Sequence, residues 1–222
     1  EMLFGYLGAV LAGFLLTATV HWTGHKTVGG KGLILLLVLW LLARVVHNSN
    51  TTFPGSAAIE LLFFAGTAFA VGRAVVMARR WRNIAFPLLL GVMGVGDLLI
   101  HLVAEGSIGE EWMTRGLWLC IDAVALSILI FGGRILPLFT KSALSLPSAR
   151  SKSALDYAGL GATGLLMIAH GFSVSAKAEA VVWALAGALT LARLYGWNGS
   201  KTLGKPLLAV LHLGWFLLAL GM

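Results

Sequence analysis

The chain has 222 residues, of which 59% are hydrophobic and 11% are charged, and its mean hydropathy is +0.91. Soluble domains carry about a quarter charged residues, so this composition excludes an ordinary soluble protein and indicates a membrane protein. In so apolar a chain, the net charge of +7 indicates basic cytoplasmic loops facing anionic lipid, and we expect no nucleic-acid partner. The single cysteine, Cys120, excludes an intrachain disulfide and a CxxC motif.

Eight apolar segments of near-spanning length follow one another along the chain. They cover residues 2–21, 31–47, 56–78, 84–103, 115–136, 154–173, 178–196 and 206–222. A hydrocarbon core about 30 Å thick requires about 20 helical residues, and continuous apolar runs without alternation indicate helices rather than strands. The sequence therefore predicts an all-α fold, a polytopic membrane helix bundle with about eight transmembrane helices. We expect residues 1–222 to form a single transmembrane helical domain.

Charge alternates between the loops that join these segments. The first, third, fifth and seventh loops carry the basic residues Lys26, Lys31, Arg79, Arg80, Arg82, Lys141, Arg150, Lys152, Lys201 and Lys205. The second loop is uncharged apart from histidine, the fourth has three glutamates against one arginine, and the sixth has one lysine and one glutamate. The positive-inside rule then places the odd loops in the cytoplasm and both ends of this chain on the periplasmic side.

Asp97 and His101 are the polar residues that most need an explanation. Together with Met93 they fall at i, i+4 and i+8 and form one stripe on the fourth helix. His212 lies about seven residues into the eighth segment. Ionisable residues inside a membrane are functional candidates, and neutral imidazole is a common ligand of haem iron and copper. We predict that His101 and His212 are metal ligands and that Asp97 orients the ring of His101 from the second shell.

Other residues are weaker candidates. Met167 and His170, at i and i+3, can offer a copper pair, although methionine is usually core filling. Arg134 can bind a carboxylate of a cofactor through its planar fork or can extend to the membrane interface. His47, His21 and His25 lie near helix ends, where a histidine is usually structural. Pro137 should end or kink the fifth helix, and we expect Glu60 and Asp122 to pair with arginines of other helices.

Several stretches resemble, in order, the NnrS family. They are EMLFGYLGAVLAGFLLTATVHWTG, RRWRNIAFPLLL, DLLIHL, GGRILPLFTKSAL and KPLLAVLHLGWFLLALG. The resemblance covers essentially the whole chain and is most specific in EMLFG, in the WTG after the first helix and in GGR-x-x-P-x-FT. The chain departs from the family pattern at Asp97, where asparagine is expected, and at His21, which also stands in place of an asparagine.

The resemblance implies a haem- and copper-containing protein of the bacterial inner membrane, linked to the nitric oxide response and denitrification. It implies about twelve spanning helices, so the chain is expected to be a fragment lacking the first helix and the last ones. His101 and His212 fall where intramembrane histidines of the family are expected, and Arg134, Pro137 and Thr140 fall within its motifs.

Two other classes of function stay open on the sequence alone. A transporter or metal permease uses buried polar residues as a pathway, but paired discontinuous helices and an internal repeat are not apparent. A structural or accessory subunit of a respiratory membrane complex uses aromatic-rich helices, here with 8 tryptophans, for packing and lipid anchoring. In that case we expect other respiratory or membrane subunits as partners, in addition to lipid and haem. The pattern places no nucleophile–base pair and no paired carboxylates, so enzymatic activity and catalytic residues stay unassigned.

Overall fold

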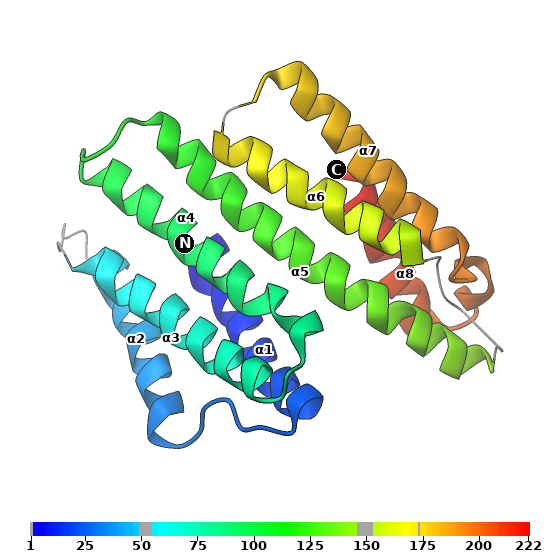
Figure 1. Ribbon diagram of the computed structural model, residues 1–222, viewed down its shortest axis with the longest axis horizontal. Coiled ribbons are helices and arrows are strands. Elements are labelled where there is room, and N and C mark those ends of the chain that lie inside the picture. The colour runs from blue at the N-terminus through cyan, green and yellow to red at the C-terminus, as the bar shows by residue number, and fades with distance from the viewer. Residues whose placement is uncertain (1, 49–54, 146–152, 173) are drawn as a thin grey trace. The chain divides into compact units, whose positions relative to one another are not determined.

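The computed structural model describes residues 2–48, 55–145, 153–172 and 174–222, and every regular element in these ranges is helical (Figure 1). A π-helix, η1 (Met2–Leu7), leads into the first α-helix. The α-helices are α1 (Gly8–Thr23), α2 (Lys31–Asn48), α3 (Ser56–Met77), α4 (Ala85–Ala104), α5 (Glu111–Leu144), α6 (Ser153–Phe172), α7 (Ala176–Tyr195) and α8 (Pro206–Leu220). Short 3₁₀ turns, η2 (Trp81–Asn83) and η3 (Gly199–Thr202), precede α4 and α8.

The predicted helical segments are confirmed, and most of their ends agree with the structure within three residues. The clear exception is α5, which extends beyond both ends of the predicted segment 115–136 and is 34 residues long. Of the two effects expected of Pro137, an end of the helix is wrong, because the helix continues to Leu144, and a kink stays a prediction. A proline removes its own N–H from the helical ladder and its ring crowds the carbonyl of residue i−4, but the turns on either side can remain helical.

Five stretches in the described part of the chain are long and apolar enough to cross a membrane. They are Leu3–Thr23, Ser56–Met77, Trp81–Ala104, Glu111–Leu144 and Ala176–Tyr195. The helix Pro206–Leu220 is apolar but shorter, at 15 residues. Large apolar side chains are exposed along many helices, for example Ile34, Phe69, Leu88, Val181 and Leu213. Such faces suit contact with lipid tails, so the chain is a polytopic helical membrane protein.

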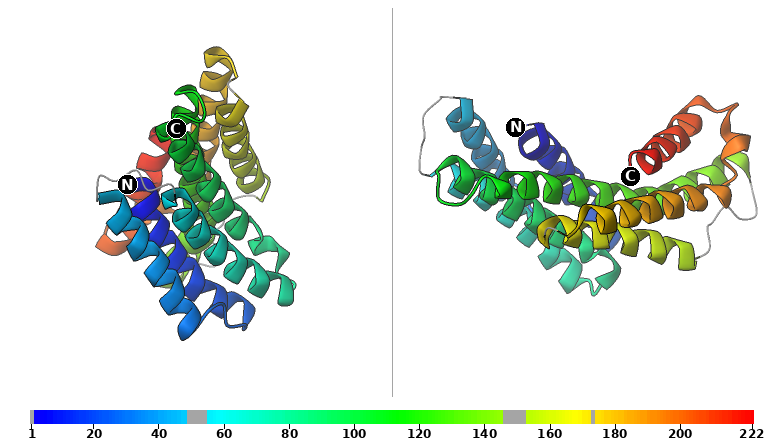
Figure 2. Two further views of the ribbon diagram at one scale, coloured as in Figure 1. Left: turned by 90° about the vertical axis from the view of Figure 1, so that its left-hand side faces the viewer. Right: turned by 90° about the horizontal axis from the view of Figure 1, so that it is seen from above.

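The chain divides into two compact units, residues 1–124 and residues 125–222. In the first unit α3 is the central helix and packs against α1, α2 and α4 (Figures 1 and 2). Small residues permit close approach of the backbones here. A side chain at Gly96 would collide with the carbonyl oxygen of Gly116, and one at Gly116 would collide with that of Gly96. Paired glycines of this kind are the usual means by which membrane helices pack tightly.

In the second unit α7 packs against both α6 and α8. Its core contains the buried side chains of Leu129, Leu136, Trp197 and Trp215. The Trp215 indole donates a hydrogen bond from Nε1 to the carbonyl oxygen of Thr190, at 2.9 Å. This bond ties α8 to α7, and it satisfies the one polar group of a ring that is otherwise buried in the apolar core.

Candidate functional site

Three ionisable side chains meet between α3 and α4 in the first unit. Glu60 lies in the second turn of α3, and Asp97 and His101 lie one turn apart on α4. Glu60 and Asp97 are only 5% and 4% exposed, and the side chain of His101 is 16% exposed. The α4 spacing of four residues places Asp97 and His101 on the same face, which α3 covers with Glu60.

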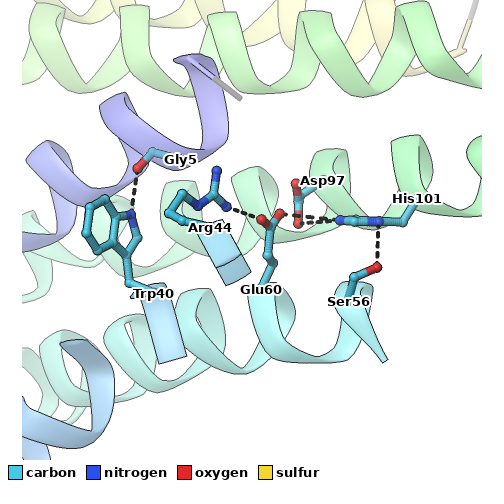
Figure 3. A network of polar contacts seen from close by, with 7 residues as sticks. All are labelled: Gly5, Trp40, Arg44, Ser56, Glu60, Asp97 and His101. Carbon is cyan, nitrogen blue, oxygen red and sulfur yellow. Dashed lines mark hydrogen bonds and ion pairs between the residues drawn. The ribbon is translucent and has the colours of Figure 1, made fainter. Parts of the chain in front are cut away.

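Their polar atoms point toward one another (Figure 3). Nε2 of His101 lies 3.4 Å from Oε2 of Glu60 and 3.8 Å from Oδ2 of Asp97. One ligand atom from each of the three residues lies within 4.8 Å of the others. The other ring nitrogen of His101, Nδ1, lies 3.4 Å from Oγ of Ser56, at the start of α3. Two carboxylates and an imidazole in this arrangement can hold a metal ion or share protons.

Arg44 of α2 completes this cluster by pairing with Glu60 through its Nη2 atom (Figure 3). The prediction that an arginine of another helix pairs with Glu60 is therefore confirmed. The guanidinium lies against Gly5 of η1, where any side chain would collide with it. Trp40, one turn before Arg44, donates from Nε1 to the carbonyl oxygen of Gly5 at 2.9 Å. The π-helix at the start of the chain thus helps to fix the arginine that neutralises Glu60.

The buried acids of the cluster require compensating positive charge. A buried carboxylate is strongly unfavourable unless an opposite charge or hydrogen bonds compensate it. Arg44 supplies one positive charge for the two acids Glu60 and Asp97. A second positive charge must come from a proton on one of the three groups or from a bound cation. The cluster is therefore suited either to proton storage or to cation binding.

His212 lies in the second unit, 8% exposed, on α8. Its Nδ1 lies 2.9 Å from the carbonyl oxygen of Leu208, which can only accept, so Nδ1 carries a proton and donates it. Nε2 faces Oγ1 of Thr140 at 3.4 Å, while the Thr140 hydroxyl donates to the carbonyl oxygen of Leu136 at 2.8 Å. In neutral His212 the backbone carbonyl of Leu208 therefore fixes the tautomer and leaves a lone pair on Nε2, which can bind a metal ion.

The remaining candidates lie elsewhere. Arg134 is exposed on α5, and His21 and His47 are exposed at the ends of α1 and α2. His170 is buried on α6 and forms an ion pair from Nε2 to Oε1 of Glu179 on α7, at 2.7 Å. Met167 is half-buried on the same helix. The structure thus brings His101 and Asp97 together and joins Glu60 to them.

Arg193 is a buried charge that the sequence analysis did not single out. It is 2% exposed on α7 and donates from Nε to Oδ1 of Asp156 on α6, at 2.8 Å. Its Cζ lies 4.8 Å from the centroid of the Trp215 ring. A side chain at Gly133 would collide with its guanidinium. In the sequence, the two glycines before Arg134 were the available sign of this contact. A glycine on a packed helix can leave space that a side chain from another helix fills.

A bundle of apolar helices with a compensated ionisable cluster inside its first unit defines a polytopic membrane protein with an intramembrane polar site. The family model for NnrS protein matches residues 1–222, the whole chain. The chain therefore belongs to the NnrS family. No curated protein and no solved structure matches it.

Proposed function

We propose that this chain is a haem- and copper-binding protein of the bacterial inner membrane that acts in the response to nitric oxide. Membership of the NnrS family supports the general function. The single observation that carries the metal part is the convergence of His101, Glu60 and Asp97, with ligand atoms within 4.8 Å of one another inside the helix bundle. Structural ion pairs rarely gather two acids and a histidine where lipid surrounds the protein.

His101 and His212 are the proposed metal ligands, one in each unit. The two histidines have different surroundings. The imidazole of His212 is held by a backbone carbonyl. The Nε2 atom of His101 lies beside two carboxylates. We assign His212 to haem iron and His101 to copper. Bound haem would supply ligand-binding and redox chemistry at its iron. Arg134, with its planar guanidinium, is the proposed partner of a cofactor carboxylate.

Orientation belongs to the same proposal. The loops before α2, before α4 and before α8 carry basic residues, and the positive-inside rule supports a cytoplasmic position for them. Both ends of the chain then lie on the periplasmic side.

The test is the absorption spectrum and metal content of the protein purified from membranes. We expect a Soret band and stoichiometric copper in the unaltered protein. His212→Ala should remove or shift the Soret band, because the imidazole that would hold the haem iron is lost. His101→Ala should lower the copper content and leave the protein in the membrane, because the apolar helices still satisfy the bilayer.

His47→Ala is the matched control, since it removes an exposed histidine at a helix end. It should leave both signals unchanged. A purified protein that contains neither haem nor copper would contradict the proposal.

A further inference from the structure

We propose that Glu60, Asp97 and His101 together bind one non-haem divalent metal ion, with all three residues as direct ligands. This inference rests on the proposed function and deepens it, because it names the class of ion at His101 and adds two ligands. It also changes the role of Asp97 from a residue that orients the imidazole to a residue that contacts the ion.

The Asp97 carboxylate has an oxygen that is suited to contact with an ion. Its Oδ2 atom is buried and has no hydrogen-bond donor within the described ranges of the chain. The nearest nitrogen of the cluster is Nε2 of His101, 3.8 Å away, which is beyond hydrogen-bonding distance. If Asp97 oriented the ring, its oxygen should accept a bond from a ring N–H at about 2.7–2.9 Å. A buried carboxylate oxygen that points at two other ligand atoms and has no donor is instead suited to direct contact with a cation.

The surroundings of the His101 ring suit a small ion. Nε2 faces the carboxylates of Glu60 and Asp97, and Nδ1 faces the hydroxyl of Ser56 at 3.4 Å. Both nitrogens thus face side chains from the packed pair α3 and α4 (Figure 3). A single ion fits between Nε2 and the two carboxylates.

The chemistry of the three side chains favours a divalent ion. Two carboxylates and one imidazole favour divalent ions such as Cu²⁺, Zn²⁺ and Fe²⁺, whereas Cu⁺ prefers thiolate and thioether sulfur. Ligands at about 2.0–2.2 Å from an ion lie about 3 Å or slightly more from one another. The observed 3.4 Å and 3.8 Å are close to that spacing. Three protein ligands also leave coordination positions open for water or another small molecule.

The charge of the cluster is consistent with this assignment. Arg44 binds Oε1 of Glu60, whereas Oε2 of the same carboxylate faces His101. The arginine and an ion can therefore be bound at once. Two carboxylates and one guanidinium sum to one negative charge, which a divalent cation overcompensates by only one unit. The rival arrangement is a metal-free network in which a proton on one of the three groups, for example on Asp97 beside Glu60 or on His101, balances the remaining negative charge.

The experiment uses Cu²⁺ as a paramagnetic probe of the full purified chain in detergent, after exchangeable metal has been removed with a chelator. We expect one Cu²⁺ per chain, with an electron paramagnetic resonance spectrum showing coupling to a single imidazole nitrogen. Zn²⁺ should compete for the same site. Binding of less than one Cu²⁺ per chain would overturn the inference and support the metal-free network. Coupling to two or more imidazoles would also overturn it, because the ion would then lie at a different site.

Near-isosteric variants then identify the ligands. Glu60→Gln, Asp97→Asn and His101→Gln should each weaken Cu²⁺ binding by more than about 100-fold, since second-shell losses cost about 10–100-fold. A smaller effect of Asp97→Asn would return Asp97 to an orienting role. Glu179→Gln is the matched control, because Glu179 pairs with His170 in a carboxylate–imidazole pair on other helices. It should leave Cu²⁺ affinity unchanged.

Haem content, measured on the same samples, separates this inference from the proposed function. A retained Soret band in a protein that binds no divalent ion at the cluster would overturn the inference alone. A protein purified without haem or copper that still binds Zn²⁺ through Glu60, Asp97 and His101 would contradict the proposed function and leave the inference standing. The spectrum of the unaltered chain decides the number of imidazole ligands even if a variant fails to fold.

Discussion

The guanidinium group of Arg193 occupies the space that a side chain at Gly133 would fill. The arginine cannot easily move aside, because Asp156 holds its Nε at 2.8 Å and its Cζ lies 4.8 Å from the centroid of the Trp215 ring. Gly133 on α5 therefore leaves room for Arg193 on α7, which lies 60 positions later in the chain.

Gly133→Ala should destabilise the protein despite the better helix propensity of alanine. The added methyl group forces the Arg193 guanidinium out of its position, and overpacking of this kind costs about 1–3 kcal/mol. The melting temperature of the purified protein in detergent measures the effect. Gly161→Ala on α6 is the control, because open space surrounds its Cβ position, and it should be neutral or slightly stabilising. Equal melting temperatures for the two variants would show that Arg193 adapts freely.

The ion pair between Arg193 and Asp156 should show strong energetic coupling. Asp156→Asn leaves a buried guanidinium without its counter-charge, and breaking a buried pair costs about 3–5 kcal/mol. The Asp156 side chain is 23% exposed, so solvent screening lowers our expectation to about 1–3 kcal/mol. A double-mutant cycle with Arg193→Met measures the coupling from unfolding free energies. Additive effects of the two substitutions would contradict a direct contribution of the pair.

The two buried histidines of the second unit should differ in their effect on haem. His212→Ala should remove the Soret band, whereas His170→Ala should preserve it, because Nε2 of His170 is engaged with Glu179 at 2.7 Å. Each variant removes one buried imidazole, so loss of packing is comparable. Absorption spectra of equal amounts of purified protein make the comparison. Loss of the band in the His170 variant with retention in the His212 variant would reverse the assignment.

Membrane orientation can be tested by cysteine labelling from outside intact cells. In a protein with Cys120 replaced by serine, a cysteine at position 110 should react with an impermeant reagent and one at position 80 should not. The physical reason is that Arg79, Arg80 and Arg82 cluster in one loop while Glu105, Glu110 and Glu111 cluster in the next. Labelling of position 80 alone would invert the proposed topology.

The helices were predictable because lipid imposes length and apolarity on every spanning segment, and these can be read directly from the residues. For the buried charges, the sequence predicted the type of partner but not which residue it would be. The charge on Glu60 required a cation, but helix rotation and packing decided that Arg44 supplies it and that Glu60 also reaches His101. The same limit applies to Arg193, whose position depends on the space left at Gly133. The expected helix end at Pro137 was wrong because the loss of one backbone donor does not by itself stop a helix.

The contact between Arg44 and Gly5 has an evolutionary consequence. Since a side chain at position 5 would displace the guanidinium that neutralises Glu60, the three positions cannot vary independently. In an alignment of family members, residues larger than glycine at position 5 should coincide with loss of the arginine at position 44. They should also coincide with an uncharged residue at position 60. The glycine of the EMLFG motif would then be retained where an arginine at position 44 neutralises an acid at position 60. Covariation of these three positions would show which relatives kept the acidic cluster.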